Sequence, residues 1–141
     1  MVKFILGAKG AGKTKWLIDN ANKDMKEGNG NIAFVDVDDN HIFSLNYNVR
    51  LINANEYNID NLDSFYGFLC GLLGMDYDLE KIYVDGIYKV INLGIEDIKN
   101  LHEKLNSIAE KTNTDFYINV DFVADELPEE LKKVSEEVVA E

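Results

Sequence analysis

A glycine-rich segment near the amino-terminal end constrains the fold of this chain more than any other feature. Residues 7–14 read GAKGAGKT, and they follow the apolar run Val2–Leu6. The next stretch, from Lys13 to about Lys26, places apolar residues near helical spacing. The sequence therefore predicts a buried strand, a glycine-rich turn and a helix, in this order.

Four further apolar runs indicate strands, and two longer stretches indicate helices between them. The strands are expected at residues 32–37, 49–53, 82–85 and 116–120, and the helices at residues 62–73 and 95–108. Residues 126–141 are expected to form an acidic helix with Pro128 in its first turn. Strands that alternate with helices and are apolar on both faces are typical of a covered parallel sheet. We therefore expect one α/β domain over residues 1–141, a three-layer sandwich with a five-stranded, mainly parallel sheet.

Composition excludes several classes of protein. The chain has 141 residues, 46% hydrophobic and 28% charged, which is enough to bury a core and argues against disorder. Acidic residues outnumber basic residues 26 to 14, a formal charge of -12. Such a surface repels phosphate backbones and anionic lipid, so neither nucleic-acid binding nor membrane association is expected. The single cysteine, Cys70, excludes an internal disulfide and no apolar run is long enough to span a membrane, so we expect a cytoplasmic protein.

The glycine-rich segment matches the phosphate-binding pattern G-x-x-x-x-G-K-[ST] at every fixed position. Its glycines let the backbone curl so that N–H groups converge on phosphate oxygens, and the following helix adds its positive end. Lys13 is expected to reach the β- and γ-phosphates, and Thr14 to ligate Mg²⁺. The alternative is a turn with a stray lysine, but the strand before it and the helix after it favour a nucleotide. The nucleotide-binding residues are expected to be Gly7, Ala8, Lys9, Gly10, Ala11, Gly12, Lys13 and Thr14.

A second acidic position completes this expectation. Three apolar residues, 82–84, precede Asp85, which puts a carboxylate at the carboxyl end of a strand, the edge where ligands bind in parallel sheets. We expect Asp85 to hold Mg²⁺ together with Thr14. The alternative is a solvated turn acid.

Together, these pieces resemble the RecA-like branch of the P-loop ATPases. Residues 33–38, Ala-Phe-Val-Asp-Val-Asp, resemble the strand that carries the water-polarising carboxylate of that family, and Asp38 holds this position. Residues 117–119 resemble the strand that ends in a polar γ-phosphate sensor, here Asn119. The resemblance covers about residues 1–122 in element order, and the chain also looks like short, stand-alone bacterial P-loop proteins of unassigned function. It implies ATP and Mg²⁺ as ligands, with Lys13, Asp38 and Asn119 as catalytic residues.

Alternatives remain for two of these residues. Asp38 stands where the family usually has Glu, and Gly86 leaves the position directly after Asp85 without a base. Asp36, Asp38 and Asp39 could equally form a solvated cluster at a strand end. Asn119 could instead be a strand-end cap.

Three functions follow from this interpretation. The first is a Mg²⁺-dependent ATPase, slow because no arginine finger is available in cis. The second is a nucleotide-dependent switch that signals its bound state to a partner and scarcely hydrolyses. The third, a small-molecule kinase, is disfavoured because such enzymes clamp the phosphoryl group with several arginines and this chain has only Arg50. ATP is the default nucleotide because no guanine-reading motif follows a late strand.

The resemblance also implies a strand order: third, second, fourth, fifth, first. Strand 2–6 would then lie at the edge of the sheet, where an uncovered apolar strand promotes association. Either residues 126–141 fold back over this edge or another chain covers it. Because Val134, Val138 and Val139 give the tail only a small apolar patch, self-association or a protein partner is favoured.

Overall fold

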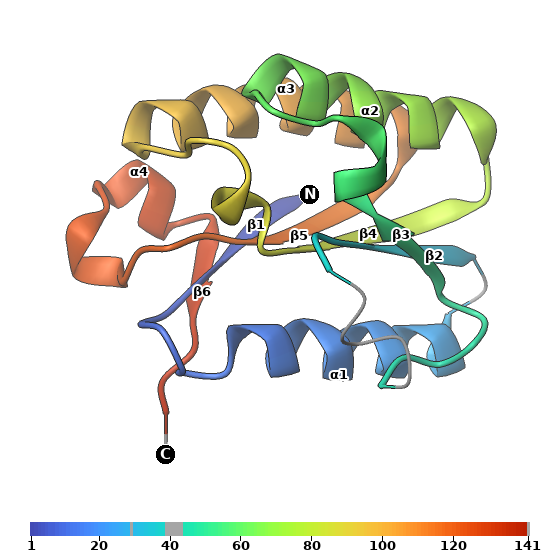
Figure 1. The fold of residues 1–141 in the computed structure, drawn as a ribbon, viewed down its shortest axis with the longest axis horizontal. Coiled ribbons are helices and arrows are strands. Elements are labelled where there is room, and N and C mark those ends of the chain that lie inside the picture. The colour runs from blue at the N-terminus through green and yellow to red at the C-terminus, as the bar shows by residue number, and fades with distance from the viewer. Residues whose placement is uncertain (29, 39–43, 141) are drawn as a thin grey trace.

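The fold is built around one sheet whose strands all run parallel. The structure, a computed structural model, describes residues 1–28, 30–38 and 44–140. Within these residues the sheet has six strands in the order β3-β2-β4-β5-β1-β6 (Figure 1). The strands are β1 Val2–Leu6, β2 Asn31–Asp36, β3 Arg50–Asn53, β4 Leu79–Asp85, β5 Asp115–Asn119 and β6 Ser135–Glu137.

Helices cover both faces of this sheet. They are α1 Lys13–Glu27, α2 Leu62–Met75, α3 Ile95–Thr112 and the short α4 Glu129–Lys132. Helix α1 lies on one face and α2 and α3 lie together on the other (Figure 1). The predicted α/β class, the parallel sheet and the helices on both faces are confirmed, and the arrangement is compatible with a three-layer sandwich. No helix in the described part of the chain has the length and apolar surface to cross a lipid bilayer.

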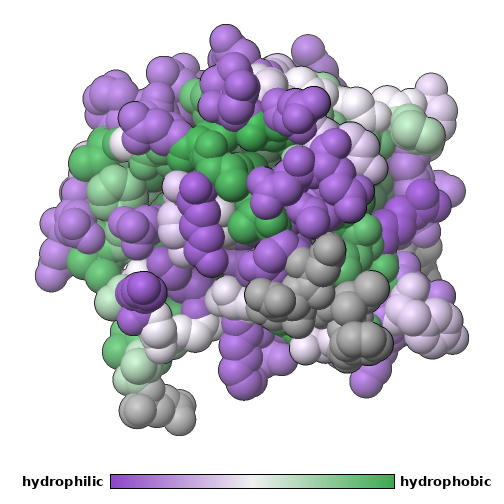
Figure 2. Space-filling view, viewed as in Figure 1, coloured by the Kyte–Doolittle hydropathy of each residue, from purple (hydrophilic) through white to green (hydrophobic). Residues whose placement is uncertain are grey.

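Each face of the sheet has its own apolar core. On the α1 face, Leu17 and Ala21 pack against Ile5, Phe34 and Tyr83, all fully buried. A larger core fills the space between the sheet and helices α2 and α3. Hydrophilic side chains cover much of the outside, with apolar residues showing between them (Figure 2). The strands read as continuous apolar runs because both of their faces are buried.

The five predicted strands form in the predicted spatial order, but β4 begins earlier than expected. It starts at Leu79, which is buried, and continues through two charged residues that the structure supplies with partners. Glu80 accepts a hydrogen bond from the Gly30 N–H at 2.9 Å, and Lys81 forms an ion pair with Asp24 at 3.0 Å. Because both charged side chains have partners, they are tolerated in the strand. The apolar pattern of the sequence did not indicate that the strand extends over these residues.

Two predictions about the tail are wrong. Residues 126–141 do not form one helix, and the sheet has six strands rather than five. After α4 the chain pairs in parallel with β1: the Phe4 N–H donates to the Val134 carbonyl at 3.0 Å, and the Val138 N–H donates to the Leu6 carbonyl at 2.8 Å. A short acidic helix has little stability by itself. Pairing of the tail with β1 instead satisfies the backbone N–H and C=O groups of that buried strand.

Strand β1 is therefore not an edge strand. Of the two expected ways to cover this edge, the fold-back of the chain's own tail is the one observed, but the tail pairs as a strand and not as a helix. The buried side chains of Leu127 and Leu131 anchor the segment that leads into β6. Because β1 has no open edge, it gives no reason to expect self-association.

Candidate functional site

The glycine-rich loop lies between β1 and α1 and depends on two of its glycines for different reasons. Gly12 has φ 107° and directly precedes the first turn of α1, a backbone conformation that side chains with a Cβ rarely adopt. A Cβ on Gly7 would lie 2.8 Å from the Val138 carbonyl oxygen, so the loop and the tail can approach only through glycine. The predicted strand, turn and helix all form here.

Lys13, the first residue of α1, points into the molecule. Its side chain is buried, and Nζ donates a hydrogen bond to the Val120 carbonyl at 3.0 Å, just past the end of β5. The ammonium also lies 5.2 Å from the centre of the Tyr88 ring. Burial lowers the pKa of Lys13, and the nearby Lys89 ammonium acts in the same direction, whereas two carboxylates oppose the shift.

Thr14 and Asp85, predicted as a pair, are in contact. The Thr14 hydroxyl donates to Asp85 Oδ1 at 3.1 Å, although 71 residues separate them in sequence. Asn119, at the end of β5, donates from Nδ2 to the same Asp85 oxygen at 2.6 Å, and its Oδ1 accepts from the Gly86 N–H at 2.8 Å. Asp85 is 4% and Asn119 1% exposed, so this network is removed from solvent.

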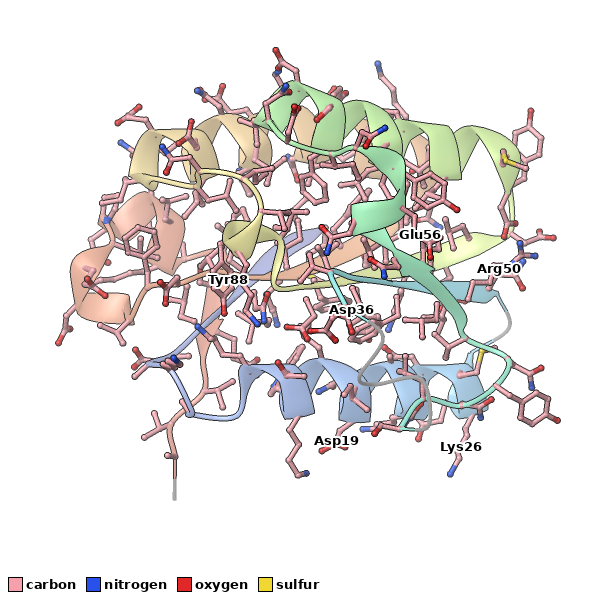
Figure 3. The ribbon with its side chains drawn as sticks, in the orientation of Figure 1. Asp19, Lys26, Asp36, Arg50, Glu56 and Tyr88 are labelled. Atoms are coloured by element: carbon pink, nitrogen blue, oxygen red, sulfur yellow. The ribbon has the colours of Figure 1, made fainter. Side chains whose placement is uncertain are left out.

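A second carboxylate lies beside this network. Asp36 ends β2 and is the register partner of Asp85 on β4, and it is also buried. Its Oδ1 accepts hydrogen bonds from the N–H groups of Val37 and Asp38, at 2.8 and 3.4 Å. Figure 3 shows Asp36 and Tyr88 within the body of the molecule, whereas Asp19 and Lys26 lie on the outer side of α1.

Asp38, predicted to polarise water, is placed at this same edge. It follows the end of β2 by two residues and is half-buried. It is not among the residues that line the cavity beside Lys13 and Thr14, so its catalytic role stays a prediction. Asp39, the third member of the predicted acidic cluster, lies outside the described residues.

Sequence reasoning missed the turn that follows β4. Residues Ile87–Lys89 form one 3-10 turn that starts from Gly86, whose φ is 78°. Tyr88 and Lys89 from this turn face the loop across a cavity of about 270 Å³. The cavity is lined by Lys9, Gly10, Gly12, Lys13, Thr14, Tyr88 and Lys89. The position of this turn in the sequence could have indicated its place at the site, because a turn that follows the carboxyl end of β4 lies at the same edge of the sheet as the loop.

A second cavity lies where the loop meets the tail. Its volume is about 330 Å³, and it is lined by Ala8, Lys9, Gly10, Ala11, Val123 and the tail residues 137–140. The tail is held there partly by Glu137, which accepts a hydrogen bond from the Ala124 N–H at 2.7 Å. The loop therefore has an open space both beside Lys13 and beside the tail.

The oxygen ligands at this edge fit Mg²⁺ that arrives with a phosphate ligand. A hydroxyl, from Thr14, and a buried carboxylate, from Asp85, lie together at the carboxyl edge of the sheet. Among the described residues no group of three or more His, Cys, Asp or Glu side chains could hold a metal ion by itself. Mg²⁺ in phosphate-binding sites takes one or two protein ligands and completes its shell with water and phosphate oxygens.

This geometry stands without support from related proteins. The chain matches no protein-family model, and comparison with curated proteins finds no match.

Proposed function

We propose that the chain is a RecA-like P-loop protein that binds Mg²⁺-ATP at residues 7–14 and hydrolyses it slowly. The observation that carries this proposal is the contact between Thr14, at the start of α1, and Asp85, at the end of β4. The sequence pattern predicts that both residues hold one metal ion, and they are in contact although 71 residues separate them. The alternative, a glycine- and alanine-rich turn with a stray lysine, does not account for the hydrogen bond between the Thr14 hydroxyl and the buried Asp85 carboxylate.

Phosphate binding follows from the groups that the loop presents. The backbone N–H groups of the loop and the first turn of α1 favour an anion. Lys13 is a buried cation whose hydrogen-bond partner is a neutral carbonyl, that of Val120. A phosphate oxygen is a stronger acceptor because it carries charge. Bound polyphosphate would therefore draw the Lys13 ammonium away from Val120.

Bound Mg²⁺ would supply a positive charge that polarises the γ-phosphoryl group. The chain's own contribution is to fix the two oxygens that face it. Asn119 holds the Asp85 carboxylate through Nδ2, and the Thr14 hydroxyl donates to the same oxygen. Asn119 acts through Asp85 and is a positioning residue in this arrangement.

In hydrolysis, a water oxygen attacks the γ-phosphorus and the bond to the β–γ bridging oxygen breaks. ADP leaves with the electron pair of that bond, and the water proton passes to a base, for which Asp38 is our candidate. Lys13 offsets the negative charge that develops on the phosphoryl oxygens. An Asp side chain is one methylene shorter than Glu, which supports slow turnover.

A nucleotide-dependent switch is the second candidate. It is favoured by the hydrogen bond from the Gly86 N–H to Asn119, since Asn119 also holds Asp85. Asp85, which is expected to hold Mg²⁺, and the turn that carries Tyr88 and Lys89 are thus both bonded to the Asn119 side chain. Turnover separates the two candidates, because both require binding and only the ATPase requires hydrolysis.

Calorimetry with Mg²⁺-ATP and Mg²⁺-ADP tests the proposal. We expect the wild-type chain to bind both nucleotides and Lys13→Ala to bind neither. Lys26→Ala removes the same charge about 20 Å further along α1 and should leave binding unchanged. No binding by the wild-type chain at millimolar nucleotide, or equal binding by wild type and Lys13→Ala, would contradict the proposal. Phosphate release measured on the same samples then decides between ATPase and switch.

A further inference from the structure

The cavity beside the loop collects positive charge in a chain that is strongly negative. Lys9, Lys13 and Lys89 all line it, although the chain carries a formal charge of -12. Within the described residues none of the three forms an ion pair. Other lysines do: Lys81 and Lys99 lie 3.0 and 2.8 Å from carboxylate oxygens.

Gathering these cations costs free energy in the nucleotide-free protein. Lys13 and Lys89 line the same cavity, so their like charges repel each other. A polyanion in the cavity would remove this repulsion.

The fold holds the Lys89 backbone firmly and leaves its side chain exposed. The turn closes through a hydrogen bond from the Lys89 N–H to the Gly86 carbonyl at 2.9 Å. The Lys89 side chain folds back over Gly86, with Cδ 3.5 Å from where a Cβ on that glycine would lie. Its neighbour Tyr88 lies against Lys13. Lys89 therefore lines the same cavity as Lys13 and Thr14, where the terminal phosphate of ATP is expected under the proposed function.

We propose that Lys89 is a phosphate-contacting finger supplied in cis, whose ammonium bonds the γ-phosphate oxygens of ATP. The proposal rests on the proposed function. It assigns to Lys89 the role of a finger, for which the sequence offers no arginine in cis. ADP lacks the γ-phosphate, so Lys89 distinguishes the two nucleotides. It also offsets the charge that develops on the phosphoryl oxygens during hydrolysis, the role that an arginine finger plays in related chemistry.

The test compares variants at one position. We expect Lys89→Ala to lower ATP affinity about 10-fold, the loss of one charge-assisted hydrogen bond, and to leave ADP affinity within about twofold. Phosphate release should fall at least as far. Lys89→Arg keeps the charge and should retain the ATP preference, and Lys26→Ala, with the same loss of charge far along α1, should match wild type. Circular dichroism and thermal melts of each variant show that the fold is kept.

The outcomes separate this inference from the proposed function. If the wild-type chain binds neither nucleotide, both are wrong. If it binds ATP and Lys13→Ala does not, while Lys89→Ala keeps the wild-type ratio of ATP to ADP affinity, only the finger is wrong. An equal loss of ATP and ADP affinity in Lys89→Ala would show that Lys89 attracts both nucleotides through its charge and does not contact the γ-phosphate specifically. This result would also overturn the inference. The affinity ratio serves this purpose even where hydrolysis is too slow to measure.

Discussion

Asn119 uses both ends of its side-chain amide. Its Nδ2 donates to the Asp85 carboxylate and its Oδ1 accepts from the Gly86 N–H, in a position that is 1% exposed. A buried amide satisfied in this way fixes the orientation of the carboxylate and the start of the turn after β4. Asn119 therefore makes hydrogen bonds at the end of β5 that link β4 to the turn after it, and its role as a phosphate sensor stays a prediction.

Asn119→Asp should destabilise the fold in a pH-dependent way. The new carboxyl group would lie beside Asp85, and repulsion and burial would raise its pKa above the unfolded value. A raised folded pKa gives stability at low pH that is lost as the pH rises, so the deficit relative to wild type should be small at about pH 4 and reach about 3 kcal/mol near pH 8. Urea denaturation at both pH values measures this difference.

Asn100→Asp is the matched control because it adds the same charge at an exposed position on α3. It should change the free energy of unfolding by less than about 0.5 kcal/mol at either pH. If Asn119→Asp is as stable as this control, the buried network described for Asn119 and Asp85 is wrong.

Among the elements, those with an apolar signature were predictable from the sequence, and two elements without such a signature, β6 and the turn after β4, were not. Strands β1 to β5 and helices α1 to α3 form close to their expected bounds because burial requires apolar residues at regular spacing. Strand β6, Ser135–Glu137, contains no apolar residue, and its place depends on hydrogen bonds to β1. The turn Ile87–Lys89 has no periodicity either, so its side of the site could not be read from the sequence.

The contact between the loop and the tail gives a test at this scale. Gly7→Ala would place a Cβ 2.8 Å from the Val138 carbonyl, so the end of β6 must move away. We expect the Val138 amide, which donates to the Leu6 carbonyl, to exchange its hydrogen about 10-fold faster or more in this variant. Amide exchange followed by NMR measures the effect.

Gly10→Ala separates tail displacement from strain in the loop. Gly10 has φ 83°, so alanine strains the backbone there, but a Cβ at this position has nothing within 4 Å. The Val138 amide should therefore exchange as in wild type. Equal acceleration in both variants would show that loop strain alone loosens the tail.

For the whole molecule, the tail converts an edge strand into an interior one. With β6 in place, β1 has neighbours on both sides, and the strands at the two edges of the sheet are β3 and β6 (Figure 1). Both are short and carry charged residues, which is how natural proteins discourage edge-to-edge association. A protein partner or a homo-oligomer remains a prediction with no support from the β1 edge.

Removing β6 should therefore expose an association surface. A chain ending at Lys133 would leave the fully buried Phe4 and Ile5 in a strand with one open edge, and we expect it to self-associate with rising concentration in sedimentation. A chain ending at Val138 keeps β6 and should sediment as the full chain does. If the shorter chain stays folded and sediments as a monomer at all concentrations, the tail does not protect this edge.

The position of β1 also sets an order of events in biosynthesis. The strand that leads into the glycine-rich loop is translated before both of its neighbours, β5 and β6, which come from residues 115–137. Until those residues have left the ribosome, β1 has no partner in the sheet, and the carboxyl edge that gathers Lys13, Val120 and Asn119 does not exist. This pairing between distant segments cannot form before the later residues have been synthesised. The proposed nucleotide binding should consequently be acquired in one late step, so that nascent chains stopped before β5 carry residues 7–14 complete and bind no nucleotide.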